Sequence, residues 1–231
     1  MLGLDSAIYA KSKKANDLIR VGIVGFSDRC RYSLVPAFMD HAKELGFEIV
    51  AVSDIWSRRR KEAVEFFKKE YDLNVRAFRN NEELYDSKMV DAVIISTADF
   101  QHATHLAEAV KAGCDAYCEK PFSETMADGR MALKAVKESG KIVQIGSQRR
   151  SAPNYHAAHD YIKSGKFGPI TMVEMTWNVN QPGRWRLPEL EKQCFEKDTD
   201  WKRYLMNRPY EPWDARKYLE YRLFWPYSSG I

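Results

Sequence analysis

A carboxylate and an ammonium group stand side by side in the run Cys118-Glu119-Lys120-Pro121, at the end of a short apolar segment. A lysine at a strand end can hydrogen-bond a substrate hydroxyl and take its proton while a hydride leaves the carbon, provided that burial or a neighbouring charge lowers its pKa. A cis bond before Pro121 is expected, because tight functional turns retain this feature. We therefore predict Lys120 as the catalytic residue. The alternative is a surface turn held by a salt bridge.

A second candidate site is the turn Gly25-Phe26-Ser27-Asp28-Arg29-Cys30, where a dinucleotide-binding fold has the pattern G-x-G-x-x-G. Only the first glycine of that pattern is present. Gly25 would make the tight turn that lets the next helix point its N-terminus at a pyrophosphate, and Ser27 could donate a hydrogen bond to a phosphate oxygen. Cys30 is small enough for the helix to pack on the strand. The turn predicts a nucleotide site, with an ordinary strand-turn-helix corner as the alternative.

Asp54 ends the second predicted strand, where a carboxylate can accept hydrogen bonds from both ribose hydroxyls of NAD. Since this carboxylate would repel a 2′-phosphate, NAD is the predicted cofactor and NADP the alternative. The run Arg58-Arg59-Arg60-Lys61 bears on that alternative, because one arginine could reach back to such a phosphate. We expect instead that the run forms a solvated helix face.

Thr97 and His102 follow the fourth predicted strand, at the edge where doubly wound sheets bind ligands. His102 either packs on the cofactor or caps the next helix, and both interpretations stay open. No metal site is predicted: His156 and His159 lack an accompanying carboxylate cluster, and the four cysteines form no C-x-x-C pair.

The elements that must position these residues alternate along the chain. Runs rich in Val, Ile or Phe predict strands at 20–25, 47–54, 74–78, 90–96, 116–119 and 142–147. Helical patterns lie at 57–71, with Ala63, Val64, Phe66 and Phe67 facing the core, and at 104–112 and 125–139, each followed by a glycine. This alternation predicts the α/β fold class, with a Rossmann-type doubly wound parallel sheet.

The pattern changes after Arg150. A helix is predicted at 154–164 and a strand at 170–177, and residues 178–212 show little periodicity. One helix, one strand and a loop cannot close a hydrophobic core, so we expect an incomplete α/β second domain. The predicted organisation is a flexible N-terminus at 1–17, a nucleotide-binding domain at 18–150 and a truncated second domain at 151–231.

Composition excludes several classes of protein. With 45% hydrophobic and 29% charged residues, the 231-residue chain is too apolar to be disordered. Its 36 basic and 32 acidic residues give a formal charge of +4 spread along the chain, so no nucleic-acid partner is predicted. No apolar run reaches the length of about 18 residues that a spanning helix needs, so no membrane partner is predicted either.

Taken together, these motifs resemble the Gfo/Idh/MocA oxidoreductase family. The resemblance rests on Gly25, Asp54, Thr97 with His102, Glu119-Lys120-Pro121, the run Ile145 to Arg150, and Gly165-Lys166-Phe167-Gly168 before a strand. It covers about residues 18 to 231, and the Glu-Lys-Pro element is its specific part.

The resemblance implies an enzyme that transfers hydride between NAD(P) and a hydroxyl of a sugar, inositol or related polyol. It places Gly25 and Ser27 at the pyrophosphate and Asp54 at the adenosine ribose, while Thr97 and His102 line the cofactor channel. Glu119 and Lys120 border the nicotinamide, Gln148 contacts the cofactor, and Arg149 lies with Lys120 on the substrate side. A second domain of this kind carries the substrate face and often a homo-oligomer interface.

Two functional alternatives stay open: a glycosidase that uses NAD for transient oxidation, and a non-catalytic cofactor-binding protein or fragment. Similar enzymes continue past a stretch like Phe224 to Ile231 into a segment with a catalytic histidine, so the chain as given is expected to bind cofactor and turn over poorly. A cytoplasmic location is expected, or a periplasmic one if a twin-arginine signal precedes Met1, since Ala15-Asn16-Asp17 resembles the start of some exported relatives.

Overall fold

The structure is a computed structural model that describes residues 18–176 and 183–228. The segment 1–17 that was predicted as flexible, and Trp177 at the end of a predicted strand, lie outside the described residues.

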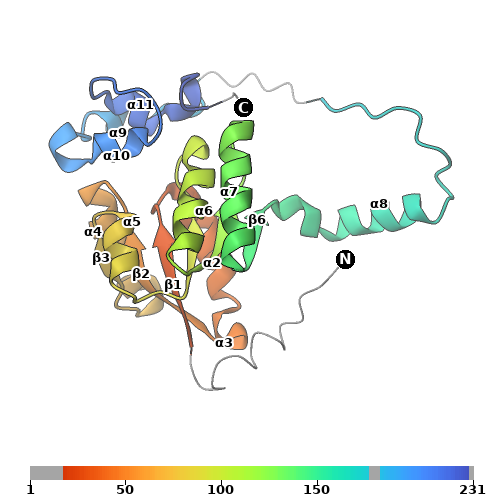
Figure 1. The fold of residues 1–231 in the computed structure, drawn as a ribbon, viewed down its shortest axis with the longest axis horizontal. Helices are drawn as coiled ribbons and strands as arrows, with labels where there is room; N and C mark the ends of the chain where they lie inside the picture. The colour runs from red at the N-terminus through yellow and green to blue at the C-terminus, as the bar shows by residue number, and fades with distance from the viewer. Residues whose placement is uncertain (1–17, 177–182, 229–231) are drawn as a thin grey trace.

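Parallel strands form a 6-stranded sheet in the order β3-β2-β1-β4-β5-β6 (Figure 1). The strands are β1 Ile19–Val24, β2 Phe47–Ser53, β3 Arg76–Phe78, β4 Ala92–Ile95, β5 Asp115–Glu119 and β6 Val143–Gly146. The order reverses direction between β1 and β4, which is the Rossmann-type arrangement and the point where such sheets bind ligands. All the strands predicted before residue 150 are present, so the predicted fold class is confirmed.

Helices connect the strands and cover both faces of the sheet. The first crossover is helical from residue 28 to 39, where a π-type turn η1 Cys30–Leu34 leads into α2 Val35–Met39, and α3 Ala42–Leu45 follows. The other elements up to residue 163 are α4 Ser57–Tyr71, α5 Asn81–Asp86, the short turn η2 Asp99–Gln101, α6 His102–Lys111, α7 Met126–Ser139, the turn η3 Gln148–Ser151 and α8 Pro153–Lys163.

Two apolar cores explain why the strands read as continuous hydrophobic runs. On β4, Val93 and Ile95 face a core that includes Leu106 of α6, while Ile94 faces the opposite core with Phe67 of α4. Alternate side chains of one strand are therefore buried on opposite faces, so every position is apolar.

Helix α4 has the predicted bounds and ends at Asp72, which adopts a left-handed conformation. Ala63 and Phe67 are fully buried, one helical turn apart. Val64 was expected to face the core, but it is 37% exposed because it lies one residue around the helix from that stripe.

The predicted strand at 170–177 is wrong over its described part. Residues 170–176 have no regular structure, and Met172, Val173 and Met175 are 79%, 73% and 90% exposed. A strand satisfies its backbone groups through a neighbour, and no strand of the described sheet pairs with this segment. Helix α8, from whose end the chain leads into this segment, has no buried residue (Figure 1).

Residues 183–228, which we name the C-terminal arm, return to the carboxyl edge of the sheet (Figure 1). The arm holds α9 Pro188–Glu191, η4 Glu196–Asp198, α10 Trp201–Leu205, α11 Ala215–Leu219 and η5 Tyr221–Leu223. Residues 178–212 show little periodicity in the sequence, yet the described part of this range contains short helices. Asp200 caps α10 by accepting a hydrogen bond from the Arg203 backbone N–H. This capping signal is easy to overlook in the sequence because the helix has only five residues.

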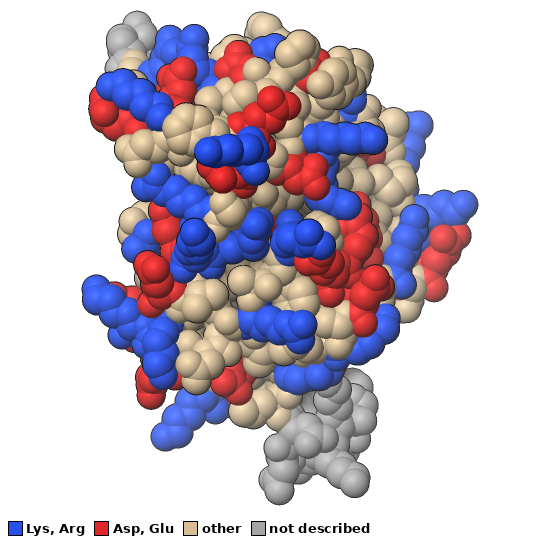
Figure 2. Space-filling view, turned by 90° about the vertical axis from the view of Figure 1, so that its left-hand side faces the viewer, with Lys and Arg blue, Asp and Glu red and all other residues tan. Residues whose placement is uncertain are grey.

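Lysine and arginine side chains mix with aspartate and glutamate over the face seen in Figure 2. Within residues 18–176 and 183–228, no helix combines the length and the apolar character needed to cross a membrane.

Candidate functional site

A cavity of about 630 Å³ opens at the carboxyl edge of the sheet, between the loops after β1 and β4 and the C-terminal arm. This volume is within the usual range for a small-molecule site. The predicted site residues that line it are Gly25, Ser27, Asp54, Thr97, His102, Glu119, Lys120 and Gln148. Arg149 is not part of this lining and is exposed in η3, so the structure does not bring it together with the others.

Gly25 makes the turn that the sequence predicts. Its φ is +82°, and a Cβ at this position would lie 2.7 Å from Cγ2 of Thr97. Both the backbone conformation and the close approach of the two loops therefore require glycine. The Ser96 hydroxyl donates to the Gly25 carbonyl at 2.8 Å and closes the gap between β1 and β4.

Ser27 uses its hydroxyl inside the loop rather than pointing it at open solvent. Its Oγ accepts from the Cys30 backbone N–H at 3.2 Å and donates to Ser96 Oγ at 3.4 Å. Cys30 is fully buried, as the packing argument predicts. The helical segment 28–39 thus begins directly beside the cavity, with the positive end of its dipole at the loop.

Asp54 ties the loop after β1 to the start of α4. Its two carboxylate oxygens accept from the backbone N–H groups of Phe26 and Trp56, each at 2.8 Å. Burial raises the pKa of Asp54, and these two N–H donors oppose that rise. Each oxygen keeps a free lone pair, so the carboxylate can still accept from a ligand hydroxyl.

The arginines after Asp54 are not the solvated face that the sequence suggests. Arg59 pairs with Asp28 at 2.8 Å and with Glu62 at 2.9 Å, and its side chain is only 14% exposed. Arg58 donates to Glu62 at 2.7 Å, and Arg60 donates to the Asp54 carbonyl at 2.7 Å. Of the three, Arg59 lines the cavity, and its two ion pairs hold the rim together there.

His102 joins two turns of the site. It is 1% exposed, with Nδ1 2.8 Å from the Pro121 carbonyl and Nε2 3.2 Å from the Thr97 carbonyl. Burial lowers the pKa of His102, so the ring is neutral and carries one N–H. The shorter contact assigns that proton to Nδ1, which donates to Pro121. His102 thus anchors the Lys120-Pro121 turn, in which the expected cis bond is present.

Thr97 leaves a polar atom without a partner. Its Oγ1 is buried, and no hydrogen-bond partner for it exists among the described residues. A buried hydroxyl in this state calls for a ligand or water beside it.

Glu119 is held by an arginine that the sequence analysis did not single out. Arg29 donates to Glu119 Oε1 from Nε at 3.2 Å and from Nη2 at 2.9 Å, and the glutamate side chain is only 4% exposed. The other oxygen accepts from the Lys120 backbone N–H at 3.2 Å. Lys120 itself is exposed, so the described residues do not supply the burial that proton transfer at this lysine calls for.

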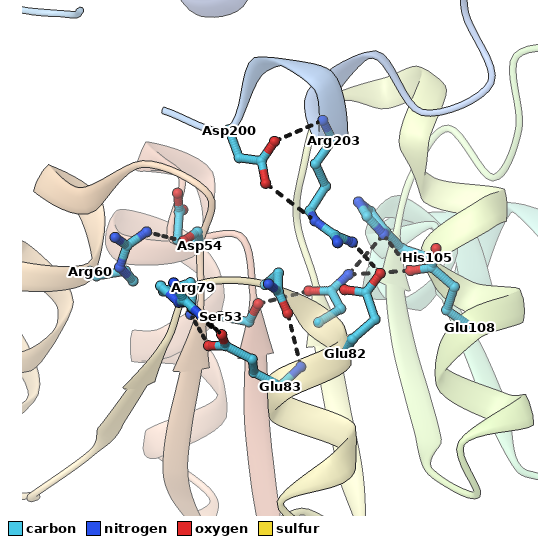
Figure 3. A network of polar contacts seen from close by, with 12 residues as sticks. Ser53, Asp54, Arg60, Arg79, Glu82, Glu83, His105, Glu108, Asp200 and Arg203 are labelled. Carbon is cyan, nitrogen blue, oxygen red and sulfur yellow. Dashed lines mark hydrogen bonds and ion pairs between the residues drawn. The ribbon is translucent and has the colours of Figure 1, made fainter. Parts of the chain in front are cut away.

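A polar network lies under the opposite side of the cavity (Figure 3). Asn81 accepts from the Ser53 hydroxyl at 2.8 Å and approaches His105 Nδ1 at 2.9 Å, while His105 lies 3.0 Å from Glu108. Contact with His105 lowers the pKa of Glu108 against the opposing effect of burial. Arg203 of the arm pairs with Glu82 at the edge of this network. Asn80 caps α5, and the pattern Asn80 to Glu83 was the signal that could have located this helix.

Residues 19–147 match the family model described as the oxidoreductase family Gfo/Idh/MocA with an NAD-binding Rossmann fold. An inositol 2-dehydrogenase of Salmonella typhimurium is 29% identical over 179 residues, which are 74% of this chain and 52% of that protein. An inositol 2-dehydrogenase of Agrobacterium fabrum is 28% identical over 198 residues, covering 83% of this chain and 55% of its own. The chain therefore spans about half the length of these relatives.

Solved structures show the same fold. An oxidoreductase from Thermotoga maritima superposes with a TM-score of 0.59 at 28% identity, over 65% of this chain and 44% of that one. The WlbA dehydrogenase from Chromobacterium violaceum, solved with NADH and UDP-GlcNAcA, gives a TM-score of 0.60 at 24% identity, over 67% and 42% of the two chains.

Proposed function

Because the chain belongs to the Gfo/Idh/MocA oxidoreductase family, we propose that it binds NAD in this cavity and transfers hydride between the nicotinamide and a hydroxyl of a sugar, inositol or related polyol. The observation that carries the proposal is the cavity itself. It brings Asp54, from the end of β2, and Lys120, from the end of β5, to one space on either side of the Gly25 turn.

The residues present fit a dinucleotide. Thr97 offers a buried hydroxyl without a partner, and the Gly25 turn lets the β1 and β4 loops approach each other at the switch point of the sheet. The start of the helical segment 28–39 faces the place where a pyrophosphate would lie. Gly25 and Ser27 would hold that group, Asp54 the adenosine ribose, and Glu119 with Gln148 the nicotinamide end.

The arrangement around Asp54 supports NAD over NADP. A 2′-phosphate would meet the Asp54 carboxylate, which both backbone contacts hold in place. Arg59, the arginine of this run that lines the cavity, is already paired with Asp28 and Glu62. A phosphate would have to break those pairs to be neutralised.

Lys120 is the proposed proton-transfer residue. A nicotinamide bound here would supply hydride transfer at the substrate carbon. Lys120 Nζ, as the neutral amine, would take the hydroxyl proton as the alcohol is oxidised, and as the ammonium would return it as the ketone is reduced. Its anchoring through Glu119 and through Pro121 fixes the backbone on both sides of the lysine. Bound substrate would cover the exposed side chain.

The proposed substrate class follows from the similar proteins, which are named as inositol 2-dehydrogenases. We also propose that residues 151–231 begin the domain that carries the substrate face.

The first test measures the binding of NADH and NADPH to the 231-residue chain. Binding is monitored as energy transfer from tryptophan to the dihydronicotinamide. We expect NADH to bind more tightly than NADPH, and Asp54→Ala to weaken NADH by at least tenfold, because a charge-assisted contact is worth about 1.5–3 kcal/mol. Asp86→Ala on the exposed end of α5 is the matched control and should leave affinity unchanged. Absence of saturable binding of either nucleotide would overturn the proposal.

Reduction of NAD with a panel of inositols and sugars then tests the substrate class on the protein at its full encoded length.

A further inference from the structure

The cavity continues beyond the residues that match the family model. That match ends at residue 147, yet the lining includes Trp185, Leu187, Arg203, Tyr204 and the run Tyr218–Arg222 of the C-terminal arm. The Rossmann unit therefore supplies only the inner side of the cavity, and the arm supplies an outer side.

Aromatic packing holds the arm on the sheet edge. Tyr204, Trp201 and Tyr227 form a buried cluster with Phe100 and Ala98, the residues that follow β4. The Phe100 and Tyr204 rings meet edge to face with centroids 5.4 Å apart, and Tyr218 meets Trp56 in the same way at 5.9 Å. Such pairs stabilise beyond the area they bury. The arm is thus seated over the ends of β2 and β4.

Polar contacts fix the same position. Asp99 Oδ1 accepts from the Tyr221 hydroxyl at 2.9 Å and from Arg222 Nη2 at 2.8 Å. The Gln101 side chain donates to the Tyr204 carbonyl at 2.8 Å. Arg203 of the arm pairs with Glu82 of α5, as Figure 3 shows.

Only part of these contacts lies on the adenosine side of the cleft. Trp56 and Glu82 lie near the end of β2, on the Asp54 side where the adenosine of a dinucleotide would lie, whereas Asp99 and Phe100 follow β4, which lies between β1 and β5. The Glu119-Lys120 turn is instead held from within the Rossmann unit, by Arg29. The arm also contacts the chain around the start of α7, where Arg208 pairs with Glu124 and the Asn207 amide donates to Asp128 at 3.0 Å.

We propose that the C-terminal arm forms the outer wall of the adenosine subsite, with the ring of Tyr218, which packs on Trp56, against the nucleotide. The inference rests on the proposed dinucleotide binding. The arm accordingly adds affinity for any ligand that carries an ADP group.

The test compares NADH with ADP on the unaltered chain and on an arm variant. The double variant Tyr221→Phe with Arg222→Met removes both donors to Asp99 and keeps the aromatic ring. We expect its affinity for NADH and for ADP to fall by the same factor, about tenfold, because two hydrogen bonds to a carboxylate no longer hold the wall. Affinities are measured by calorimetry, with ADP also displacing NADH.

A second variant distinguishes a specific effect of the arm from a general loss of folding. Glu82→Gln breaks the pair with Arg203 from an exposed position on α5 outside the cavity lining, and should weaken both ligands by about two- to threefold. Lys202→Gln, which removes one charge from an exposed position of α10, is the matched control and should change neither affinity.

The outcomes separate the two proposals. If the unaltered chain binds neither NADH nor ADP, the proposed function and this inference both fail. If it binds them and both the double variant and Glu82→Gln bind as tightly as the unaltered chain, only the inference fails. Weaker NADH binding with unchanged ADP binding would also overturn it, because the arm would then act on the nicotinamide half.

Discussion

The two halves of the cleft are held by different kinds of contact. On the adenosine side, Asp54 is buried between two backbone donors, and the arm packs over it with aromatic side chains. On the nicotinamide side, one ion pair and one histidine hold the turn that carries Lys120, and the lysine is exposed.

This difference matches what each half has to do. A side that binds a fixed part of a cofactor gains from a rigid, desolvated wall, because little ordering remains to be done on binding. A side that must admit and release substrate needs its reactive group accessible, with only the backbone beneath it fixed. Contacts that fix the nicotinamide side should therefore affect turnover and stability, and contacts of the adenosine side should affect cofactor affinity and choice.

The largest effect is expected at Lys120. In the protein at its full encoded length, Lys120→Ala should lower turnover by about a thousandfold, within the range for loss of a general acid-base group, and change NAD affinity by no more than a few fold. Steady-state kinetics and a binding titration check the two halves of this statement. Lys111→Ala at the exposed end of α6 is the control. Turnover close to that of the unaltered enzyme would remove Lys120 from the mechanism and with it the functional contrast between the halves.

The next effect concerns the ion pair beneath that lysine. Arg29→Met should lower the free energy of unfolding by about 2 kcal/mol, because it leaves the buried Glu119 carboxylate without its cation. Arg29 is itself 40% exposed, so water can partly solvate the orphaned carboxylate, and the loss should stay below that of a fully buried pair.

A double variant separates the pair from general packing at Arg29. Arg29→Met combined with Glu119→Gln should recover most of the lost stability, since no unpaired charge stays buried. Urea unfolding curves of the single and double variants provide the measurement. Equal stability of the single and double variants would show that Arg29 does not stabilise the protein by pairing with the charge of Glu119.

The sequence predicted the structure well where the residues of an element themselves determine whether it forms a strand or a helix. The run at β4 is apolar at every position, and those at β1 and β2 are mostly apolar, because both faces of the sheet are buried. Helix α4 shows its buried stripe of Ala63 and Phe67 at helical spacing. Strand ends also share one edge, which is why Asp54, Thr97 and Lys120 could be expected in one cavity.

The sequence was a poor guide where an interaction partner is distant along the chain or does not occur among the described residues. Arg29 and Glu119 are 90 residues apart, and no spacing rule connects them. The packing of Tyr204 on Phe100 likewise depends on how the arm returns to the sheet. The run Ile170 to Met175 has strand-forming residues, but propensity alone cannot supply the neighbour that a strand requires.

A smaller effect should appear as a pH dependence of stability at the junction of the halves. Burial lowers the pKa of His102 in the folded state, whereas the unfolded state titrates near the ordinary value of about 6.5. The unfolded chain thus binds the proton more readily. Stability is fully present above that value and is lost as pH falls from it through the folded pKa, with a slope of at most about 1.4 kcal/mol per pH unit.

His102→Asn isolates this contribution, because an asparagine amide can donate to Pro121 from the δ position without titrating. Its stability should fall less steeply between pH 6.5 and the acid limit of folding than that of the unaltered chain, about pH 6.5 being the ordinary histidine value. His156→Asn on exposed α8 should follow the unaltered curve. Parallel curves for His102→Asn and the unaltered chain would mean that His102 is not held neutral.

The smallest effect tests cofactor choice on the adenosine side. Asp28→Asn removes one of the two carboxylates that occupy Arg59, at 2.8 Å, and leaves Glu62 as the other. The guanidinium then has donors free for a 2′-phosphate, so the ratio of NADPH to NADH affinity should rise by about threefold, the scale of a partly exposed ion pair. The gain should shrink with added salt, since the rim is reached by solvent. Glu65→Gln on the exposed face of α4 makes the same change in net charge away from Arg59, so it separates the local pair from the overall field. A ratio that moves equally in both variants would place Arg59 out of reach of the ribose, and the NAD preference would then rest on Asp54 alone.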